Sequence, residues 1–387
     1  MEKKKLGRIA QLKHKEEKYK FKVDENNFGL LDFSKEQRDR YSPYKISWFP
    51  EKLKALQENR VTPPISSLIN PTNRCNQDCF FCVYAVNYSG MHEGMELKNE
   101  LSKEKLFEIL DNFKDMGVKS VTYSGGGEPL LHPHATEYLQ RTIDNGIDLS
   151  IITNGELMKG EKAEVLKNGK WIRVSMDYYT PEGFVASSRG REKSFYKVVE
   201  NVQNFAKIKN KDCDLGCNWV ITKENHKEIF EASKFMKSIG MDNIKFCAVW
   251  IKDFEKYHRS LKTRVMKDLY RIEEELADES FRVYDNYKIT IDKNTLYRPY
   301  HKCLFMQVTP VIGADGVVYN CHNKGYDRSG MIGDINNQSF KKMWMSEKTA
   351  KYFEEFDAQL SCRHQCAPDL KNIHMHELLS LHGDNYV

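Results

Sequence analysis

This sequence predicts an α/β fold built from parallel βα units, on three observations. Six apolar segments of strand length alternate with amphipathic segments of helical length between residues 65 and 250. Strands separated by helices pair in parallel, because the crossover helix returns the chain to the start of the next strand. From residue 283 the pattern changes to short hairpin-like runs that carry cysteines. We therefore expect an open or partial barrel of six units, too few for a closed eight-stranded barrel, followed by a small β-hairpin/α cysteine-rich module.

The strands and helices of the barrel are assigned from their hydrophobic periodicity. The helix over residues 102–116 illustrates the pattern, with Ser102 as its N-cap and Gly117 as its stop. Its apolar face consists of Leu106, Ile109, Leu110 and Phe113. The predicted strands are Ile65–Ile69, Val118–Tyr123, Asp148–Thr153, Trp171–Met176, Leu215–Thr222 and Ile244–Trp250. The predicted helices cover residues 102–116, 133–144, 160–167, 193–209, 226–238 and 257–278.

Three domains follow from these patterns: a basic, polar N-terminal extension (1–60), the barrel core (61–282) and the cysteine-bearing module (283–387). Residues 1–22 contain nine Lys or Arg against three Glu, whereas the rest of the chain is nearly neutral. Such a segment can contact RNA or an acidic protein, but a solvated tail is the simplest interpretation. No RNA-binding signature accompanies it, so RNA is a disfavoured partner and DNA is not expected.

The distribution of apolar residues and cysteines also indicates the cellular compartment. No apolar run approaches the roughly 18–20 residues of a membrane helix, and the first residues lack the apolar segment of a secretory signal. The sequence therefore predicts a cytoplasmic protein without a membrane partner. Thiols stay reduced in that compartment, so the ten cysteines indicate metal ligation rather than disulfides.

Cys75, Cys79 and Cys82 form a C-x3-C-x2-C spacing directly after the first predicted strand. Thiolates favour zinc and iron–sulfur clusters. A structural zinc site normally has four protein ligands, but no fourth Cys or His lies close by, His92 being ten residues further on. Three ligands fit a cubane cluster with one iron left open to an exogenous ligand. On spacing alone, a buried thiol group or a zinc knuckle is the alternative.

The second predicted strand ends in "SGGGEP" (124–129). Glycines at the carboxyl end of a barrel strand let a ligand approach the backbone, and Glu128 can accept a hydrogen bond from a ligand ammonium. The three cysteines, the aromatic Phe81 before the last of them, and this G-G-E-P segment together resemble the radical S-adenosylmethionine (SAM) superfamily. The resemblance extends over roughly residues 61–280 and includes "IITNGELM" (151–158) and the segment 171–190.

This resemblance implies a partial (β/α)6 TIM-like barrel, the radical SAM core, with a 4Fe-4S cluster on Cys75, Cys79 and Cys82. SAM would chelate the open iron, and an electron from a flavodoxin- or ferredoxin-like donor would split it into methionine and a 5′-deoxyadenosyl radical that takes hydrogen from the substrate. Gly126, Gly127 and Glu128 would hold the methionyl ammonium, and the other cofactor-binding candidates are Phe81, Asn154, Ser175, Asp177 and Arg189. Ser175 and Asp177 could instead cap a turn, and Arg189 could form a surface salt bridge.

The C-terminal module carries a second set of cysteines. Cys303 and Cys321 bracket a hairpin-like segment with "GADG" at its turn, and Cys362 and Cys366 follow in "SCRHQC". The spacing resembles the start of the SPASM module of radical SAM enzymes. A full module has seven cysteines and two clusters, so these four indicate one auxiliary 4Fe-4S cluster, as in the shortened Twitch form. A structural zinc site with the same four ligands is the alternative.

An auxiliary cluster with four protein ligands can accept an electron from a substrate radical, or it can simply join the module to the barrel. The first role predicts oxidation or rearrangement of a small polar metabolite that resembles a sugar or aminocyclitol. A peptide- or protein-modifying enzyme, acting on ribosomal peptides or sulfatases, is the alternative. A non-catalytic zinc-binding interaction protein is a third hypothesis.

The remaining candidate residues have simpler interpretations. Three further cysteines are expected to be buried free thiols that pack as small apolar groups, although two of them could in principle bind metal. The histidines are expected to have surface or packing roles, and those of residues 374–382 could shield the auxiliary site. No catalytic acid or base is assigned among the residues expected near the barrel mouth. The cysteines are Cys213, Cys217 and Cys247, and the residues near the mouth are Tyr84, Tyr88, Tyr123, Lys252 and Arg298.

Overall fold

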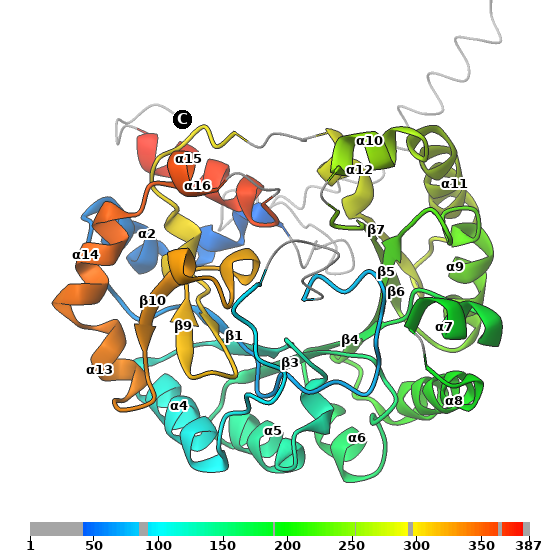
Figure 1. Ribbon diagram of the computed structural model, residues 1–387, viewed down its shortest axis with the longest axis horizontal. Coiled ribbons are helices and arrows are strands. Elements are labelled where there is room, and N and C mark those ends of the chain that lie inside the picture. Colours follow the sequence, from blue (N-terminus) through cyan, green and yellow to red (C-terminus); the bar gives the residue numbers. More distant parts are fainter. Residues whose placement is uncertain are drawn as a thin grey trace, which may run out of the picture. The chain divides into compact units, whose positions relative to one another are not determined.

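One continuous sheet organises the part of the chain that this computed structural model describes, residues 42–84, 92–188, 190–251, 253–292, 297–362 and 366–381. Its ten strands lie in the order β10-β9-β8-β1-β2-β3-β4-β5-β6-β7 (Figure 1). Pairing is parallel from β8 through β1 to β7, and antiparallel for β8–β9 and β9–β10. The strands are β1 (Ser66–Ile69), β2 (Ser120–Tyr123), β3 (Asp148–Thr153), β4 (Trp171–Ser175), β5 (Asp214–Ile221), β6 (Asn243–Ala248), β7 (Arg282–Asp285), β8 (Val311–Ile312), β9 (Val317–Tyr319) and β10 (Met331–Asp334).

Helices follow most of the parallel strands and cover the outer face of the sheet (Figure 1). Residues 49–387 form one compact unit, and the described part of the preceding unit is the 3-10 helix η2 (Pro43–Trp48). Within the described residues, no helix is both long and apolar enough to cross a membrane. The α-helices are α2 (Pro50–Gln57), α4 (Lys103–Met116), α5 (Ala135–Asp144), α6 (Glu161–Leu166), α7 (Pro181–Ser188), α8 (Glu192–Ile208), α9 (Ile229–Ser238), α10 (Phe254–Arg259), α11 (Lys262–Glu275), α12 (Asn286–Asp292), α13 (Phe340–Trp344), α14 (Glu347–Glu355), α15 (Ala358–Ser361) and α16 (Asp369–Ser380). The remaining 3-10 helices are η3 (Pro129–Leu131), η4 (Leu304–Gln307), η5 (His322–Lys324) and η6 (Arg328–Gly330).

The six predicted barrel strands are confirmed as β1 to β6, but the structure adds β7 as a further parallel strand. β7 pairs with β6, and all four of its residues are only partly buried. The sequence "RVYD" is short and not continuously apolar, so it lacked the pattern of an interior strand. β7 also spans the predicted boundary at residue 282, and the three-domain division stays a prediction. The predicted helix over 257–278 is divided into α10 and α11.

The helix predicted from its capping residues and apolar face is confirmed as α4. The Ser102 hydroxyl accepts a hydrogen bond from the Lys105 backbone N–H (3.1 Å), which satisfies a free donor of the first turn. Gly117 ends the helix at φ 74°, a left-handed conformation that favours glycine. The buried residues of α4 are Leu106, Ile109, Leu110 and Phe113.

The predicted hairpin of the C-terminal module is formed by β8 and β9. The Gly313 N–H donates to the Val317 carbonyl (2.9 Å), and Gly316 lies at the turn with φ 74°. β8 also pairs in parallel with β1 through Leu68 and Ile69. The sheet of the C-terminal module therefore continues the sheet of the barrel.

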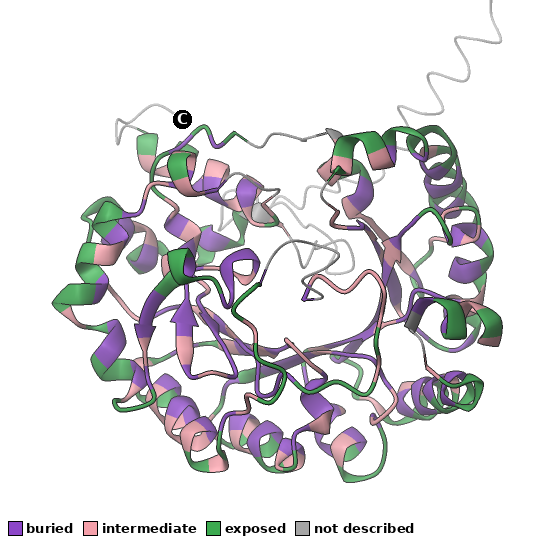
Figure 2. Cartoon of the chain, viewed as in Figure 1, coloured by how far each residue is buried: buried purple, intermediate pink, exposed green. Residues whose placement is uncertain are grey.

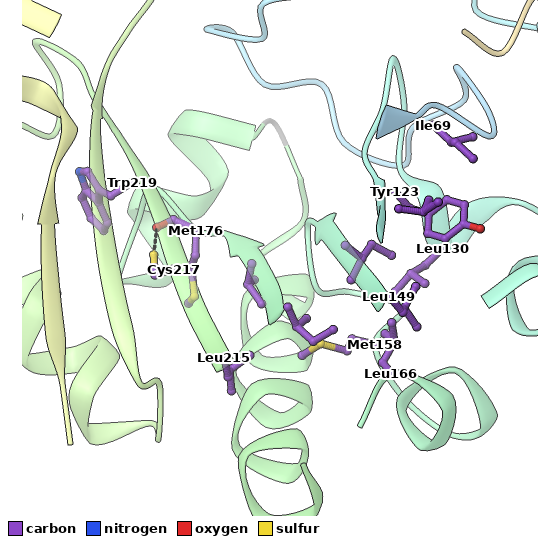
Figure 3. Packing of buried hydrophobic residues seen from close by; sticks show 14 of the residues in the cluster. Ile69, Tyr123, Leu130, Leu149, Met158, Leu166, Met176, Leu215, Cys217 and Trp219 are labelled. Carbon is purple, nitrogen blue, oxygen red and sulfur yellow. Dashed lines mark hydrogen bonds between the residues drawn. The ribbon is translucent and has the colours of Figure 1, made fainter. Parts of the chain in front are cut away.

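The core lies between the sheet and the outer helices. One row of side chains in register across five strands is at most 1 % exposed, and it packs against the helices. Figure 3 shows part of this packing, and Figure 2 shows the buried strands at the centre of the molecule, between exposed helix surfaces. This burial stabilises the barrel and leaves the opposite, inner face of the sheet free to carry polar side chains. The row consists of Ile69, Tyr123, Ile151, Ile172 and Leu215.

The free energy of unfolding should depend on pH because of His258, which is buried on α10. Its Nε2 atom lies 3.1 Å from the Val249 carbonyl oxygen and its Nδ1 atom 3.3 Å from the Tyr287 hydroxyl. Burial lowers the pKa of His258 from 6.5 to about 4. The unfolded chain therefore binds a proton more readily, so this stabilisation is complete above pH 6.5 and decreases as the pH falls towards 4. Between pH 7 and pH 5 the loss should reach about 2 kcal/mol.

Urea unfolding of the anaerobically reconstituted protein at pH 7 and pH 5 measures this loss. His258→Phe should be less stable than wild type at pH 7 but should lose about 2 kcal/mol less on acidification. His226→Gln is the matched control, because His226 is only partly buried and its Nδ1 atom makes an exposed contact with the Lys223 carbonyl oxygen (2.8 Å). Any acid lability of bound clusters is common to the three proteins and cancels in the comparison. Equal acid sensitivity of wild type and His258→Phe would contradict the prediction.

Candidate active site

The loop that follows β1 carries the first three cysteines at the carboxyl edge of the parallel strands. Cys75 is exposed, whereas Cys79 and Cys82 are half-buried, and the Cys82 N–H donates to the Cys79 carbonyl (3.1 Å). Burial raises the pKa of Cys79, and the nearby charges of Asp177, Cys82 and Cys75 raise it further. The three thiols are therefore close neighbours, as the spacing predicted, and their ligation of a cluster stays a prediction.

Backbone hydrogen bonds from two directions hold the first part of this loop. On one side, the Leu101 N–H donates to the Pro71 carbonyl (2.9 Å) and the Asn73 N–H donates to the Asn99 carbonyl (3.0 Å). On the other side, the segment after β2 donates through Gly127 to Thr72 (3.1 Å) and through Glu128 to Arg74 (2.9 Å). The chain entering Cys75 is therefore fixed before the first thiol.

Gly126 and Gly127 are required here because the cysteine loop approaches them closely, through the Asn73 side chain at Gly126 and the Arg74 backbone at Gly127. A Cβ atom on Gly126 would lie 2.1 Å from Asn73 Oδ1, and one on Gly127 would lie 2.0 Å from the Arg74 carbonyl oxygen. Both distances are shorter than any ordinary contact, so a side chain would displace the cysteine loop. We expected these glycines to admit a ligand; the structure shows that they admit the cysteine loop. Their contact with SAM stays a prediction.

Glu128 is 2 % exposed, and three protein donors surround its carboxylate. Its Oε1 atom accepts from the Thr153 hydroxyl (2.6 Å) and the Leu130 N–H (3.0 Å), and Oε2 accepts from the Asn154 N–H (2.7 Å). Burial raises the pKa of Glu128, and these hydrogen bonds oppose the increase. The carboxylate therefore joins the ends of β2 and β3. The predicted contact with a ligand ammonium would have to share these oxygens.

Asn154 connects the end of β3 to the cysteine loop. Its Nδ2 atom donates to Asn76 Oδ1 (2.8 Å), and Asn76 Nδ2 donates in turn to Glu156 Oε2 (2.9 Å). Asn76 follows Cys75 directly, so this chain of hydrogen bonds orients the loop next to its first thiol. Asn154 was predicted as a cofactor contact, whereas no local pattern in the sequence indicated Asn76 or Glu156.

The other predicted SAM contacts lie at the same edge or outside the described residues. Ser175 is the last residue of β4 and is partly exposed. Asp177 is 6 % exposed and accepts a hydrogen bond from the Val220 N–H, and burial raises its pKa to about 7. Phe81 is half-buried, with its ring edge-on to the ring of Phe80. Arg189 lies outside the described residues.

The four cysteines of the C-terminal module are also brought together. Cys303 and Cys321 immediately precede η4 and η5, Cys362 ends α15, and Cys366 lies just before α16. Burial raises the pKa of Cys303 to about 11 and that of Cys321 to about 12, and the charge of Cys362 adds to both increases. Burial also raises the pKa of Cys366, with further contributions from Cys303 and Cys321. Metal binding would therefore have to release protons from these thiols.

Two buried cations and an amide complement these thiols. Lys324 and Arg298 are 7 % and 2 % exposed, and both charges oppose the increase that burial causes in the pKa of Cys362. Asn372 Nδ2 donates to Cys303 Sγ (3.4 Å), and Arg298 also pairs with Asp369 (2.9 Å). A cluster with four thiolate ligands is anionic, so these neighbours suit it.

Thiolates can bind either a single zinc ion or an iron–sulfur cluster, and the two centres arrange their ligands differently. Zinc takes all its ligands on one ion, whereas a cubane binds its thiolates through separate irons. Across the ranges that the structure describes, no three His, Cys, Asp or Glu side chains are close enough to share one metal ion. Both cysteine sets consist of free thiols, which are the donors that iron–sulfur clusters take.

A layer of aromatic side chains connects the two cysteine regions, which sequence analysis did not predict. The Tyr84 hydroxyl lies 3.1 Å from His322 Nδ1, so residues near Cys82 and Cys321 are in direct contact. The Tyr326 hydroxyl donates to Asn73 Oδ1 (2.5 Å). Two features of the sequence could have indicated this contact: Tyr84, two positions after Cys82, and His322, next to Cys321.

The remaining cysteines and candidate mouth residues are only partly as expected. Cys213 and Cys217 are buried in the core, as predicted, but Cys247 is partly exposed on β6 and is not a buried thiol. Tyr123 is buried on the outer face of the sheet, where its hydroxyl contacts Thr142 (2.7 Å). Arg298 lies by the auxiliary thiols, as described above. Tyr88 and Lys252 lie outside the described residues.

Comparison with known proteins identifies two domains and several relatives. The chain matches the radical SAM superfamily over residues 69–236 and the iron–sulfur cluster-binding domain SPASM over residues 303–367. A probable GTP 3′,8-cyclase of Sulfolobus acidocaldarius is 26 % identical over 236 residues, 61 % of this chain and 68 % of that protein. An S-adenosylmethionine-dependent nucleotide dehydratase of Selenomonas ruminantium is 28 % identical over 163 residues, 41 % of this chain and 56 % of that protein.

A solved structure with a similar fold covers both domains. Streptococcus suis SuiB bound to precursor peptide SuiA has a TM-score of 0.60 and 18 % identity, over 96 % of this chain and 82 % of SuiB. At this identity the likeness concerns the fold, a partial TIM-like barrel with a C-terminal cysteine-rich module. With a radical SAM domain followed by a SPASM domain, this chain belongs to the radical SAM superfamily, and its cofactors are SAM and iron–sulfur clusters.

Proposed function

We propose that this protein cleaves SAM reductively and uses the resulting radical to oxidise or rearrange a small polar metabolite, such as a sugar or an aminocyclitol. The observation that carries the proposal is the three-thiol loop at the carboxyl edge of the barrel. Hydrogen bonds from the ends of two neighbouring strands hold that loop. The carboxyl edge is where α/β barrels place their chemistry.

In this proposal Cys75, Cys79 and Cys82 hold a 4Fe-4S cluster and leave one iron position without a protein ligand. Cys303, Cys321, Cys362 and Cys366 hold the auxiliary cluster. When bound, the first cluster supplies the electron that splits SAM into methionine and a 5′-deoxyadenosyl radical, and the second can accept the electron that a substrate radical gives up. A flavodoxin- or ferredoxin-like protein is the proposed electron donor.

The described residues around the first three thiols have positioning roles. Gly126 and Gly127 let the cysteine loop pack against β2, and Asn154 orients Asn76 beside Cys75. Phe81, Ser175 and Asp177 are the proposed contacts on the side of the adenosine, and Arg189 is the proposed partner of the SAM carboxylate. Holding both reactants in one geometry favours hydrogen transfer over competing reactions.

Two observations bear on the class of substrate. Two of the relatives are named for reactions on GTP or on nucleotides, which are small molecules. This supports a metabolite substrate. The match to SPASM favours a second candidate, a peptide or protein substrate, because many SPASM enzymes modify ribosomal peptides or sulfatases.

Replacing Gly127 with alanine should remove the first cluster selectively. The new Cβ would lie 2.0 Å from the Arg74 carbonyl oxygen, so the loop that carries Cys75 must move. After anaerobic reconstitution we expect about half the iron of wild type. SAM should no longer change the electron paramagnetic resonance spectrum of the reduced protein.

Two further variants calibrate the Gly127→Ala result. In Gly183→Ala, on α7, the nearest atom to the new Cβ is the Thr180 hydroxyl at 3.3 Å, so the iron content should match wild type. Cys366→Ala should lose the auxiliary cluster but keep the response to SAM. Full reconstitution of Gly127→Ala, with a normal response to SAM, would show that the backbone contact is dispensable.

Glu128→Gln tests whether the buried carboxylate joins the strand ends. Three protein groups now donate hydrogen bonds to the Glu128 carboxylate. In the glutamine variant, the side-chain NH2 group would face at least one of these donors and could not accept its hydrogen bond. We expect a loss of stability of about 1–3 kcal/mol, measured by thermal unfolding, and weaker SAM binding as its consequence. Unchanged stability with weaker SAM binding would instead support the predicted ammonium contact.

The reaction itself is tested by measuring 5′-deoxyadenosine with the reduced, reconstituted protein. Host extract is divided by a membrane with a cutoff of a few kilodaltons, and each fraction is added separately. We expect the small-molecule fraction to stimulate 5′-deoxyadenosine formation, because the proposed substrate is a metabolite. Cys75→Ala should form none with either fraction, because the first cluster would lack a ligand.

Other outcomes of this assay lead to different conclusions. Stimulation only by the large fraction would overturn the metabolite proposal in favour of a peptide, protein or RNA substrate. Absence of SAM cleavage in wild type with dithionite and with a flavodoxin system would overturn the reductive cleavage itself.

A further inference from the structure

The inner face of the sheet is polar and accessible along β5 and β6. Exposure alternates on both strands: Asn218 and Val220, and Lys245 and Cys247, are partly exposed between buried neighbours. Helices cover the other face (Figure 1), so the exposed positions face the interior of the barrel. A solvent-accessible strand position inside a barrel is available to a ligand.

The strand register places four polar side chains in one row on this face. Ser175 of β4 is paired with Asn218 of β5, Asn218 with Lys245 of β6, and Lys245 with Tyr284 of β7. Paired residues of parallel strands point to the same side of the sheet. Ser175 is the last residue of β4, so the row lies towards the carboxyl edge that carries the cysteine loop.

The next row towards the amino ends adds a second cation, and the Asn243 side chain fills the space over Gly216, where a Cβ atom would lie 2.2 Å from Asn243 Oδ1. Arg173 of β4 is paired with Gly216 of β5, and Gly216 with Asn243 of β6. Arg173 is 5 % exposed, and its guanidinium lies over the Trp171 ring, 5.3 Å from its centre. Gly216 contributes no side chain between Arg173 and Asn243.

Positive charge predominates on this side of the barrel. Arg282 of β7 forms an ion pair with Asp214, which also accepts from Asn243 Nδ2 (2.9 Å). Among the inward-facing strand positions of β4 to β7, Arg173, Lys245 and Arg282 are therefore basic and Asp214 is acidic. On β3 the residue paired with Arg173 is the uncharged Ile152, and the next row towards the amino ends has the uncharged Leu68 and Thr122 on β1 and β2.

We propose that this inner surface of β4 to β7 binds an anionic group of the substrate, a phosphate or a carboxylate, through Lys245 and Arg173. Asn218 and Tyr284 lie beside Lys245 in the same row and can donate hydrogen bonds to the same group. Charge-assisted hydrogen bonds to such anions are stronger than neutral ones. The proposal specifies the substrate class of the proposed function and rests on it.

The test uses the full-length, anaerobically reconstituted protein with SAM bound. Titration calorimetry at constant ionic strength measures binding of sodium pyrophosphate and, separately, of succinate, so that the two arms distinguish phosphate from carboxylate recognition. Wild type should bind at least one of them. Lys245→Met should bind it about tenfold or more weakly, and Lys245→Arg should stay within about threefold of wild type.

Two controls keep the result interpretable. Lys234→Met removes an exposed lysine that pairs with Glu231 on α9 (3.3 Å), and it should bind the anion as wild type does. In wild type alone, the bound anion should slow alkylation of Cys247, which lies on the same face as Lys245, and equimolar sodium chloride should not. This second measurement does not depend on the folding of any variant.

The outcomes separate this inference from the proposed function. Absence of anion binding by wild type, or equal binding by wild type and Lys245→Met together with unprotected Cys247, would overturn the anion site. SAM cleavage is measured in the same preparation. Cleavage with the small-molecule fraction but without anion binding would leave the proposed function intact. Binding at Lys245 without cleavage in that assay would overturn the proposed function and leave an anion site with no substrate role.

Discussion

Close contact between two backbone segments at the carboxyl edge of the barrel is the constraint on which the candidate site depends. The segment after β2 donates two hydrogen bonds to the loop before Cys75, and the Arg74 carbonyl lies so close to Gly127 that no side chain fits there. Backbone contact of this kind is stiffer than contact between side chains, because few rotatable bonds can absorb a displacement. The Glu128 carboxylate extends the same connection to β3. The position of the first thiol is therefore determined by the sheet itself.

The continuity of the sheet extends this constraint to the second set of cysteines. β8, which begins the hairpin between Cys303 and Cys321, pairs directly with β1, which leads into the first cysteine loop. Contacts of Tyr84 with His322 and of Tyr326 with Asn73 hold the two regions together on the same side of β1. Residues that are more than 200 positions apart in the chain are thereby kept in a fixed relation. A reaction that involves both cysteine sets would require this arrangement.

Local patterns explain which parts of the fold and site were predictable. The helix α4 was predicted in full because its cap, its apolar face and its terminal glycine are all local signals. The strand β7 was missed because its four residues are partly exposed and carry no interior pattern. Cys247 was expected to be buried, but it is paired with Val220 of β5 and therefore faces the interior of the barrel. This orientation follows from the pairing register of β5 and β6, which the sequence does not show. The partners of Glu128 were not predicted because Thr153 and Asn154 belong to a different strand.

By itself the sequence determined the alternation of strands and helices, the two groups of cysteines and the glycine–glutamate segment, because each of these is a local feature of composition or spacing. The tertiary structure alone decided what those residues face. Gly126 and Gly127 contact the cysteine loop, Glu128 joins two strand ends, and Lys245 points into the barrel beside Asn218. The physical reason is that side-chain direction and close approach follow from strand register, which depends on pairing between segments distant in the chain.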